Sequence, residues 1–304
     1  MHPAISGLWP ALLHPLQEGG EIDTGLAVAH AKAQLAAGCD GVTLFGTTGE
    51  GPAFSVAERN ALLDAMLAAG VRPDQLVVTI SAMAPGDAIS LGRHALERGV
   101  QRQMLMPPFY FKQPRDAGIV EAVSAVVRGM GSDTLRLVLY HFPAISTAGF
   151  THAAIAELIK RHPLQVVGIK DSTGDLEHTL GLVKAFPQLS VLVGAEPHVA
   201  PVMLAGGAGT ICGLSNAAPG LMRRIVSAPA HVSADDAQLM TQLLALHAVK
   251  PGMPFVPVYK TIMAEQSGNA GWLGVRAPLS PLESDEDAAV RQGYRGIGAL
   301  LQSV

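Results

Sequence analysis

The chain has 304 residues, of which 49% are hydrophobic and only 15% are charged, and its formal net charge is −4. A high apolar fraction with few charges excludes an intrinsically disordered chain, and scattered basic residues give no electrostatic footprint for nucleic acid. No run of about 18 uncharged apolar residues free of Pro and Gly is present, so we expect no membrane span. The length suffices for one large α/β domain or for two smaller ones.

Two further features bear on where the protein works. Cys39 and Cys212 lie far apart in apolar stretches, which is typical of small core residues in a reducing compartment rather than of a disulfide framework. Residues 1–15 show no basic segment followed by an apolar one, so we expect no secretory signal. Together these features predict a cytoplasmic protein.

Short apolar runs rich in β-branched residues alternate along the chain with Ala- and Leu-rich segments. The runs predicted as strands are 7–13, 40–46, 75–82, 102–108, 135–142, 166–170, 190–195 and 209–215. The segments with the clearest helical spacing are 24–37, 55–69, 87–98 and 151–161. Thr24, Ser55 and Thr151 are the candidate N-caps of three of these helices, and Glu58 follows Ser55 at capping-box spacing.

This alternation predicts a parallel β-sheet. At this length a closed (β/α)8 TIM barrel is the leading solution, and an open doubly wound sheet is the alternative. The open sheet would be favoured by a G-x-G-x-x-G pattern after an early strand, which residues 46–51 (GTTGEG) do not match. The strand signal stops near residue 224. We therefore predict a barrel over residues 1–224 and a C-terminal helical extension over residues 225–304.

In barrels of this kind the active site lies at the carboxyl ends of the strands. The second predicted strand is followed there by the sequence GTTGE. Gly46 and Gly49 suit a tight turn, whose backbone N–H groups could bind a carboxylate together with the hydroxyls of Thr47 and Thr48. We expect Glu50 to be structural, buried and bonded to backbone N–H groups of its own turn.

Lys170 ends the sixth predicted strand, which is otherwise apolar and predicted to be buried on both faces. An unpaired ammonium group is costly to bury, so the simple alternative is a strand end that reaches solvent. A buried lysine side chain is also the usual nucleophile for a Schiff base with a ketone. Tyr140 ends the fifth strand, and a phenol there could relay protons. Lys170, Tyr140 and the carboxylate-binding turn together provide the functional groups that a class I pyruvate-type aldolase needs.

Three motifs carry a resemblance to a known family: GTTGE (46–50), YHFP (140–143) and GIKDSTGD (168–175). In this order, at these strand ends, they resemble the N-acetylneuraminate lyase and dihydrodipicolinate synthase superfamily, and the resemblance runs along nearly the whole chain. It implies a (β/α)8 barrel with a C-terminal helical extension, assembled as a homotetramer from dimers. It also implies pyruvate, or another 2-keto acid, and an aldehyde as reaction partners.

The resemblance assigns roles to individual residues. It implies that Lys170 forms the Schiff base with pyruvate, without any cofactor, and that Tyr140 is the proton relay. Thr47 and Thr48, with Gly46, would hold the substrate carboxylate, and Thr47 would join the relay. Tyr110, which follows the fourth predicted strand, would be contributed across the dimer interface as in the synthases.

Departures from the family pattern bear on the substrate. Dihydrodipicolinate synthases carry an arginine for the carboxylates of their aldehyde where this chain has Ile145, and losing that clamp disfavours such a substrate. The segment PAIS (143–146) instead resembles sialic acid lyases and 2-keto-3-deoxy sugar acid aldolases. His141 replaces the usual asparagine and is a candidate substrate contact. Glu196 and Ile211 are further candidates, Glu196 lying where sugar-acid enzymes place polyol-binding acids.

The leading function is therefore a lyase acting on a 2-keto-3-deoxy sugar acid or a related 2-keto acid. Dihydrodipicolinate synthase is the second candidate, and a dehydratase or hydratase-aldolase on another 2-keto acid is the third. A non-catalytic keto-acid-binding protein is the alternative from another class. The histidines show no HxxxH or HxH spacing, so we expect no metal site.

Overall fold

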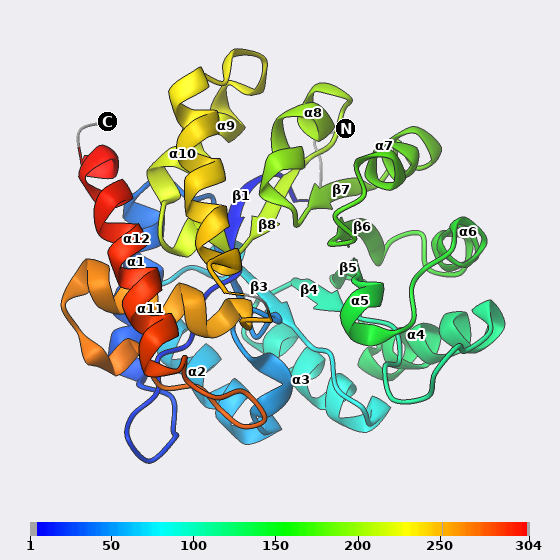
Figure 1. The fold of residues 1–304 in the computed structure, drawn as a ribbon. Coiled ribbons are helices and arrows are strands. Elements are labelled where there is room, and N and C mark those ends of the chain that lie inside the picture. Colours follow the sequence, from blue (N-terminus) through cyan, green and yellow to red (C-terminus); the bar gives the residue numbers. More distant parts are fainter. Residues whose placement is uncertain (1–4, 251, 303–304) are drawn as a thin grey trace.

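In the computed structural model, which describes residues 5–250 and 252–302, eight parallel strands form one sheet (Figure 1). They are β1 (Gly7–Pro10), β2 (Val42–Leu44), β3 (Leu76–Thr79), β4 (Arg102–Leu105), β5 (Arg136–His141), β6 (Val166–Asp171), β7 (Ser190–Val193) and β8 (Gly209–Cys212). Their order in the sheet is β1-β8-β7-β6-β5-β4-β3-β2, and a parallel bridge between Ala11 and Thr43 brings β2 beside β1. The predicted (β/α)8 TIM barrel is confirmed, and the open sheet is wrong.

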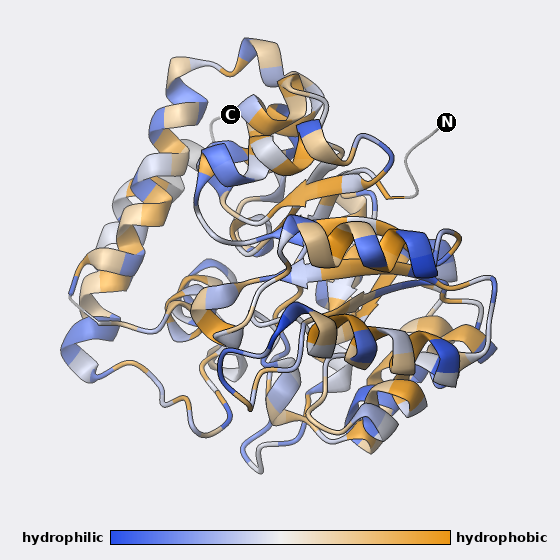
Figure 2. Cartoon of the chain, turned by 90° about the vertical axis from the view of Figure 1, so that its right-hand side faces the viewer, coloured by the Kyte–Doolittle hydropathy of each residue, from blue (hydrophilic) through white to orange (hydrophobic). Residues whose placement is uncertain are grey.

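Helices follow the strands around the outside of the barrel. They are α1 (Thr24–Ala36), α2 (Val56–Ala68), α3 (Pro85–Glu97), α4 (Asp116–Met130), α6 (His152–Arg161), α7 (Leu176–Ala185), α8 (Val199–Leu204) and α9 (Pro219–Ser227), with a short α5 (Pro143–Ser146) after β5. Figure 2 shows hydrophobic residues along the strands and mixed hydrophobic and hydrophilic residues along the outer helices. This is the pattern of helices that bury one side against a sheet.

Two of the three predicted helix N-caps are confirmed. Ser55 accepts from the backbone N–H of Glu58 in a complete capping box, and Thr151 accepts from the backbone N–H of Ala154. The cap predicted at Thr24 is wrong, because the Asp23 side chain accepts from Leu26 and Thr24 is the first residue of α1. Adjacent Asp and Thr are both good N-caps, and the backbone conformation at Asp23 decides between them.

The barrel interior is filled by large apolar side chains from the strands. Trp9, Met104, Val138 and Leu192 belong to one buried cluster, in which Tyr140 lies at the carboxyl end of β5. Because side chains alternate between the two faces of a strand, the residues between them pack outward against the helices. The interior is therefore a packed core that supports a site only at its rim.

The C-terminal helices α10 (Ala234–Ala245), α11 (Phe255–Ser267) and α12 (Ser284–Gln302) lie on one side of the barrel, at the left of Figure 1. Leu243 of α10, Ile262 of α11 and Val290 of α12 share a buried cluster with Leu221 of α9. We refer to these three helices and their connecting segments as the extension. The boundary proposed at residue 224 falls within α9, and the extension shares its core with the barrel.

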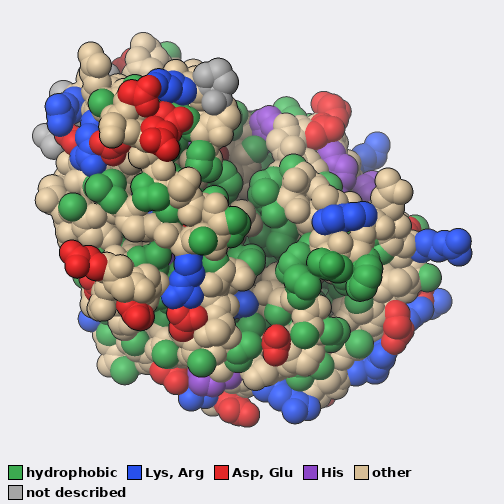
Figure 3. Space-filling model, turned by 60° about the horizontal axis from the view of Figure 1, so that its bottom comes forward, with side chains coloured by type: hydrophobic (Ala, Val, Ile, Leu, Met, Phe, Trp, Pro, Cys, Tyr) green, Lys and Arg blue, Asp and Glu red, His purple; other side chains and the backbone are tan. Residues whose placement is uncertain are grey.

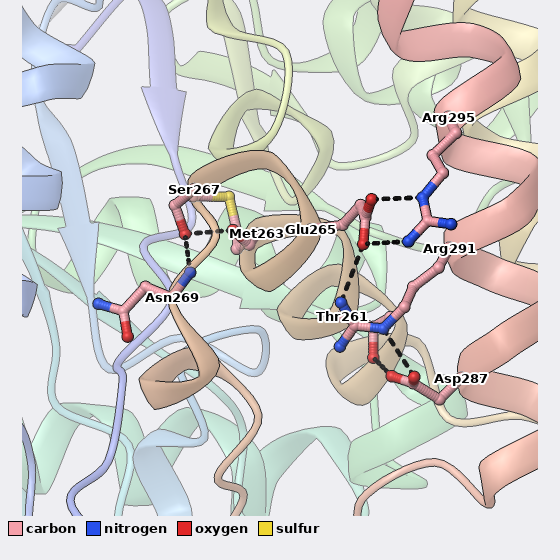
Figure 4. Close-up of polar contacts among 8 residues, drawn as sticks. All are labelled: Thr261, Met263, Glu265, Ser267, Asn269, Asp287, Arg291 and Arg295. Atoms are coloured by element: carbon pink, nitrogen blue, oxygen red, sulfur yellow. Dashed lines mark hydrogen bonds and ion pairs between the residues drawn. The ribbon is translucent and has the colours of Figure 1, made fainter.

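Ion pairs join α11 to α12 on the outer side of the extension (Figure 4). Glu265 of α11 accepts from Arg291 and Arg295 of α12, at 3.0 and 2.6 Å. The Thr261 hydroxyl donates to the Asp287 carboxylate at 3.2 Å. These contacts hold the two helices side by side without reaching the barrel.

Both cysteines are free and buried, as predicted. Burial raises the pKa of each thiol to about 12, so Cys39 and Cys212 are neutral thiols near pH 7. Among the residues that the structure describes, no helix combines the length and the apolar character needed to cross a membrane. Figure 3 shows acidic and basic side chains interspersed on one face, around a hollow bordered by hydrophobic side chains.

Candidate active site

A cavity of about 320 Å³ opens at the carboxyl ends of the strands. One part of its lining comes from strand ends and their loops, and we call Thr47, Thr48, Tyr140 and Lys170 the barrel wall. Another part comes from the extension, and we call Leu244, His247, Phe255 and Tyr259 the extension wall. The remaining lining residues are Ala11, Phe142, Ser172, Thr173, Gly174, Gly194, Ala195, Glu196, Ile211, Cys212 and Gly213.

The GTTGE turn after β2 is held in an unusual backbone conformation. Phe45, just before the turn, and Glu50, its last residue, have φ of 59° and 56°, which is the left-handed region that residues with side chains rarely adopt. Gly49 is required by close packing, because a Cβ there would lie 2.5 Å from the carbonyl oxygen of Leu12. His14 also binds the Gly49 carbonyl oxygen through Nδ1, at 2.6 Å. Such strain is typical of a functional turn fixed by its surroundings.

The turn presents polar groups to the cavity. Within the described residues, no acceptor pairs with the backbone N–H groups of Thr47 and Thr48. The Gly51 N–H donates to the Gly46 carbonyl oxygen at 3.1 Å, and the Glu50 N–H donates to that of Thr47 at 3.0 Å, so the turn is closed by its own backbone. Gly46 contributes to this closure rather than to the cavity lining. Free N–H groups beside two hydroxyls form a concave site suited to a carboxylate.

Tyr140 and Lys170 are register partners in β5 and β6, so both side chains point to the same inner face. Lys170 is only 4% exposed, which excludes a strand end that reaches solvent. Its Nζ lies 4.2 Å from the centre of the Tyr140 ring. The Tyr140 and Thr47 hydroxyls are hydrogen-bonded at 3.0 Å. The structure therefore brings the predicted amine, phenol and hydroxyl together in one cavity.

His141 and Asp171 follow these two residues in the strands and face away from the cavity. The Phe150 N–H donates to Nδ1 of His141, and Asp171 is bonded to His178 and to the Thr179 hydroxyl. Burial lowers the pKa of His141 to about 4, so the ring is neutral near pH 7. The structure does not bring His141 to the cavity, although the sequence makes it a candidate substrate contact.

His141, Asp171 and His178 lie within 4.8 Å of one another and offer nitrogen and oxygen atoms of the kind that bind metals. The two imidazole rings, however, are stacked, with an angle of 16° between their planes. Ring nitrogen lone pairs lie in the ring plane, so those of stacked rings run parallel and do not converge on one ion. This group is better explained as a network that fixes the ends of β5 and β6.

Glu196 and Ile211 both line the cavity, where the sequence predicts them. Glu196 is 8% exposed and accepts from the Leu214 backbone N–H at 2.9 Å. Burial raises the pKa of its carboxyl above the ordinary value. Burial, followed by the charge of Glu196, raises the pKa of Tyr259 well above its ordinary range. Burial therefore disfavours the charged form of both groups in this part of the cavity.

Glu50 is buried as predicted, but its expected partners are wrong. Its carboxylate pairs with the Lys260 ammonium of α11 at 2.5 Å and accepts from the Arg276 backbone N–H at 2.7 Å. Both side chains of the ion pair are fully buried, and Lys260 also donates to the Gly274 carbonyl oxygen. Burial lowers the pKa of Lys260, and the charge of Glu50 opposes that shift. This buried pair ties the GTTGE turn to the extension.

Tyr110 and Ile145 do not line the cavity of this chain. Tyr110 is 62% exposed and packs edge-on against Phe111, which is 76% exposed. Ile145 of α5 is 51% exposed. A role for Tyr110 at the site therefore requires a second chain, as the family resemblance implies.

The extension wall is not predicted by any motif in the sequence. His247 and Tyr259 lie outside every predicted motif, and they reach the cavity from elements that follow the barrel. Tyr259 and Lys260 are polar residues within the apolar run 254–264 of α11, which is the same kind of signal that singled out Lys170. His247 has no comparable signal in the sequence.

The barrel places a buried lysine beside a tyrosine at the strand ends, which is the arrangement that the sequence predicts for a class I aldolase. Residues 4–294 match the Dihydrodipicolinate synthetase family, and the chain belongs to this family. Since members of the family are lyases, the protein is a lyase.

Individual known proteins are similar to this chain over nearly its whole length. The chain is 34% identical to an "Uncharacterized DapA-like lyase" of Chloroflexus aurantiacus, over 96% of this chain and 97% of the relative. The crystal structure of dihydrodipicolinate synthase from Agrobacterium tumefaciens has a TM-score of 0.88 at 31% identity, over 96% and 99% of the two chains. A Sulfolobus 2-keto-3-deoxygluconate aldolase in complex with D-KDPG shares the fold, with a TM-score of 0.86 at 19% identity over 98% of each chain.

Proposed function

We propose that the protein is a class I lyase that makes or breaks a carbon–carbon bond to pyruvate, with Lys170 as the Schiff-base lysine. The observation that carries this proposal is the contact of Lys170 Nζ with Tyr140, whose hydroxyl is bonded to Thr47 in the same cavity. No cofactor is needed, because the amine itself supplies the electrophilic catalysis once it is joined to the keto acid.

In the synthetic direction, the neutral Lys170 amine attacks the keto carbon of pyruvate to form a carbinolamine. Loss of the hydroxyl group as water then gives an iminium ion, and the linked Tyr140 and Thr47 hydroxyls supply the proton for that water. The hydroxyl pair, now short of that proton, takes one from the methyl group and so converts the iminium to an enamine. The enamine carbon attacks the aldehyde carbonyl, and the pair returns the proton to the aldehyde oxygen. Addition of water across the resulting iminium releases the product and restores the amine. Cleavage is the reverse sequence.

The GTTGE turn fits the carboxylate of the keto acid. The backbone N–H groups of Thr47 and Thr48 have no acceptor among the described residues, and their hydroxyls lie at the same turn. Backbone donors and hydroxyls can hold a carboxylate without a cationic side chain, and they fix its orientation. The keto carbon would then face the amine on the neighbouring strand ends.

For the aldehyde half, we propose a 2-keto-3-deoxy sugar acid or a related 2-keto acid as the complete substrate. Lys170 is the only lysine or arginine among the described residues that line the cavity, and Ile145 stands where the family clamp would be. A second carboxylate would therefore be buried without a partner. Dihydrodipicolinate synthase remains the second candidate, because the Agrobacterium enzyme of that name is 31% identical to this chain.

We also infer a cytoplasmic homotetramer built from dimers, with Tyr110 at the dimer interface. The exposure of Tyr110 and Phe111, at 62% and 76%, supports this inference, because large aromatic side chains on a surface favour contact with another chain.

Borohydride trapping tests the Schiff base. The protein is incubated with pyruvate, reduced with borohydride and digested, and peptides are examined by mass spectrometry for a reduced pyruvyl adduct. We expect the adduct on the peptide that contains Lys170 and no adduct on Lys170→Met. The matched control Lys160→Met, on the outer helix α6, should be trapped like the natural protein. An unmodified Lys170 with pyruvate and with longer 2-keto acids would overturn the proposal and favour a keto-acid-binding protein.

A further inference from the structure

Arg59 of α2 is a buried cation close to the GTTGE turn. It is only 3% exposed, and its guanidinium group donates to the carbonyl oxygens of Thr79 and Ser81, the latter at 3.0 Å. No aspartate or glutamate among the described residues forms an ion pair with it, and the exposed Asp87 acts on its pKa only from a distance. Burial lowers the pKa of Arg59 to about 10, so the group is charged near pH 7. An unpaired charge is costly to bury, and this arginine would therefore attract an anion bound nearby.

Two contacts place this guanidinium group at the beginning of the turn. It lies over the ring of Phe45, 5.3 Å from the ring centre, and Phe45 immediately precedes Gly46. Thr79, whose carbonyl oxygen it binds, also lies beside the turn, because the Thr79 hydroxyl oxygen is 3.9 Å from a Cβ built at Gly46. Burial lowers the pKa of His14 to about 3, and the charge of the arginine adds to that shift. Since His14 is itself bonded to the turn, this charge acts at the turn.

The other charged groups that join the turn to its surroundings are paired. Glu50 of the turn is paired with Lys260, and Glu58 is paired with Arg276, whose backbone N–H binds Glu50. Each pair contributes one positive and one negative charge, so Arg59 is left without a countercharge among these five residues. The carboxylate of a keto acid in the turn would supply that missing negative charge from the cavity side.

We propose that Arg59 supplies the positive charge that makes the GTTGE turn prefer a carboxylate to a neutral group, without touching the substrate. It acts from beside Phe45, and so it is a positioning residue for the keto acid rather than a catalytic one. Charges in the protein interior are screened less than in water, so a cation one layer behind a site still acts on an anion bound there. The inference rests on the proposed lyase function and deepens it by assigning the selection of 2-keto acids over neutral ketones.

The test compares pyruvate with pyruvamide, in which a neutral amide replaces the carboxylate. The ketone concentration that gives half-maximal borohydride trapping at Lys170 measures the affinity for each. The natural enzyme should need at least about tenfold more pyruvamide than pyruvate. Arg59→Gln removes the charge but keeps an amide donor for the Thr79 and Ser81 carbonyl oxygens. This variant should raise the half-maximal pyruvate concentration about tenfold and that of pyruvamide by less than about twofold.

Further variants separate the charge from a structural role, which would weaken the binding of both ketones alike. Arg59→Lys keeps the charge and should stay within about threefold of the natural enzyme for both ketones. The control Arg98→Gln, at an arginine that ends α3 and pairs with Asp64, should match the natural enzyme. In aldol formation, Arg59→Gln should raise the KM for pyruvate and leave kcat within about threefold, because Lys170 and Tyr140 are unchanged.

Equal weakening of both ketones in Arg59→Gln, or an unchanged pyruvate titration, would overturn the inference. A natural enzyme that is trapped by pyruvamide as readily as by pyruvate would overturn it too. If pyruvamide is not trapped at all, pyruvate alone decides, because similar losses in Arg59→Gln and Arg59→Lys contradict a role for the charge and a loss confined to Arg59→Gln supports it.

If Arg59→Gln does not fold, Arg59→Met replaces it as the neutral variant. If neither folds, Arg59→Lys decides, since a retained preference for pyruvate supports the inference and a lost preference contradicts it. Failure of both ketones to be trapped by the natural enzyme would instead refute the lyase mechanism.

Discussion

The barrel wall and the extension wall of the cavity hold their polar groups in different ways. On the barrel wall, Lys170 contacts the Tyr140 ring, and Tyr140 is bonded to Thr47. On the extension wall, His247 is packed against Tyr259 but has no hydrogen-bond partner among the described residues. Groups already bonded to each other suit the steps common to every substrate. The groups proposed to carry the chemistry therefore lie on the barrel wall, and the extension wall adds Leu244, Phe255 and Tyr259 to the cavity lining.

The largest expected effect is a loss of activity from a substitution in the barrel wall. Tyr140→Phe removes the hydroxyl bonded to Thr47 while the ring keeps its place beside Lys170, so proton transfer should fail without loss of packing. We expect kcat to fall about 10³-fold, which is roughly 4 kcal/mol of barrier. Steady-state kinetics measure this loss, and the matched control is Tyr294→Phe, on α12 and away from the cavity. An equal loss in both variants would mean that Tyr140 is only a packing residue.

The next largest expected effect is a loss of stability when the buried ion pair between the GTTGE turn and α11 is removed. Glu50 belongs to the GTTGE turn, and its fully buried partner Lys260 follows Tyr259 in α11. Lys260→Met leaves the Glu50 carboxylate buried without a countercharge, which should lower the free energy of unfolding by about 3 kcal/mol. Urea denaturation measures this change, and the double variant Glu50→Gln/Lys260→Met should recover part of it. An unchanged unfolding midpoint in Lys260→Met would show that this pair does not hold the turn to the extension.

A smaller, pH-dependent effect concerns the ion pair between Arg276 and Glu58 of α2. The hydrogen bond from Arg276 lowers the pKa of Glu58 to about 2 from an ordinary 4.5. A carboxyl whose folded-state pKa is depressed stabilises the fold fully above its unfolded pKa, so this contribution is complete above about pH 4.5 and is lost as the pH falls toward 2. Because the Glu58 side chain is 33% exposed, solvent screening reduces the contribution to about 1 kcal/mol.

Glu58→Gln should therefore remove about 1 kcal/mol of stability at pH 7 and flatten the loss of stability between pH 4.5 and 2. Thermal unfolding across this range measures the effect. Glu18→Gln is the control at an exposed carboxyl, and the same flattening in that variant would contradict the assignment.

The smallest effect lies inside the extension. Glu265→Gln weakens the pairs with Arg291 and Arg295 shown in Figure 4, one of which involves a largely exposed arginine. We expect a loss of about 0.5–1 kcal/mol in unfolding free energy, reduced further by salt, and no change in kcat/KM. Denaturation at low and high salt, together with kinetics, would check both expectations. A change in aldehyde preference would show that the α11–α12 contact also shapes the extension wall.

Much of the barrel wall could be predicted from the sequence. Lys170 is conspicuous because a lysine in an apolar β-branched run is rare, and strand alternation places it at a rim with Tyr140. The same alternation also predicts that His141 faces away from the cavity. Adjacent side chains of a strand point to opposite faces, so the neighbour of an inward Tyr140 packs outward. The sequence therefore held information on His141 that motif comparison alone overlooked.

The amino-acid sequence by itself determined the barrel, the family and the residues of the barrel wall, because strand periodicity and the order of motifs are local properties that one chain displays directly. Only the tertiary structure decided that His247 and Tyr259 reach the cavity and that Glu50 pairs with Lys260. Those contacts join residues far apart in the chain, and helical periodicity tells which side of α11 is buried but not which cavity lies beside it. The walls thus differ in predictability because one is built within strands and the other by packing between distant elements.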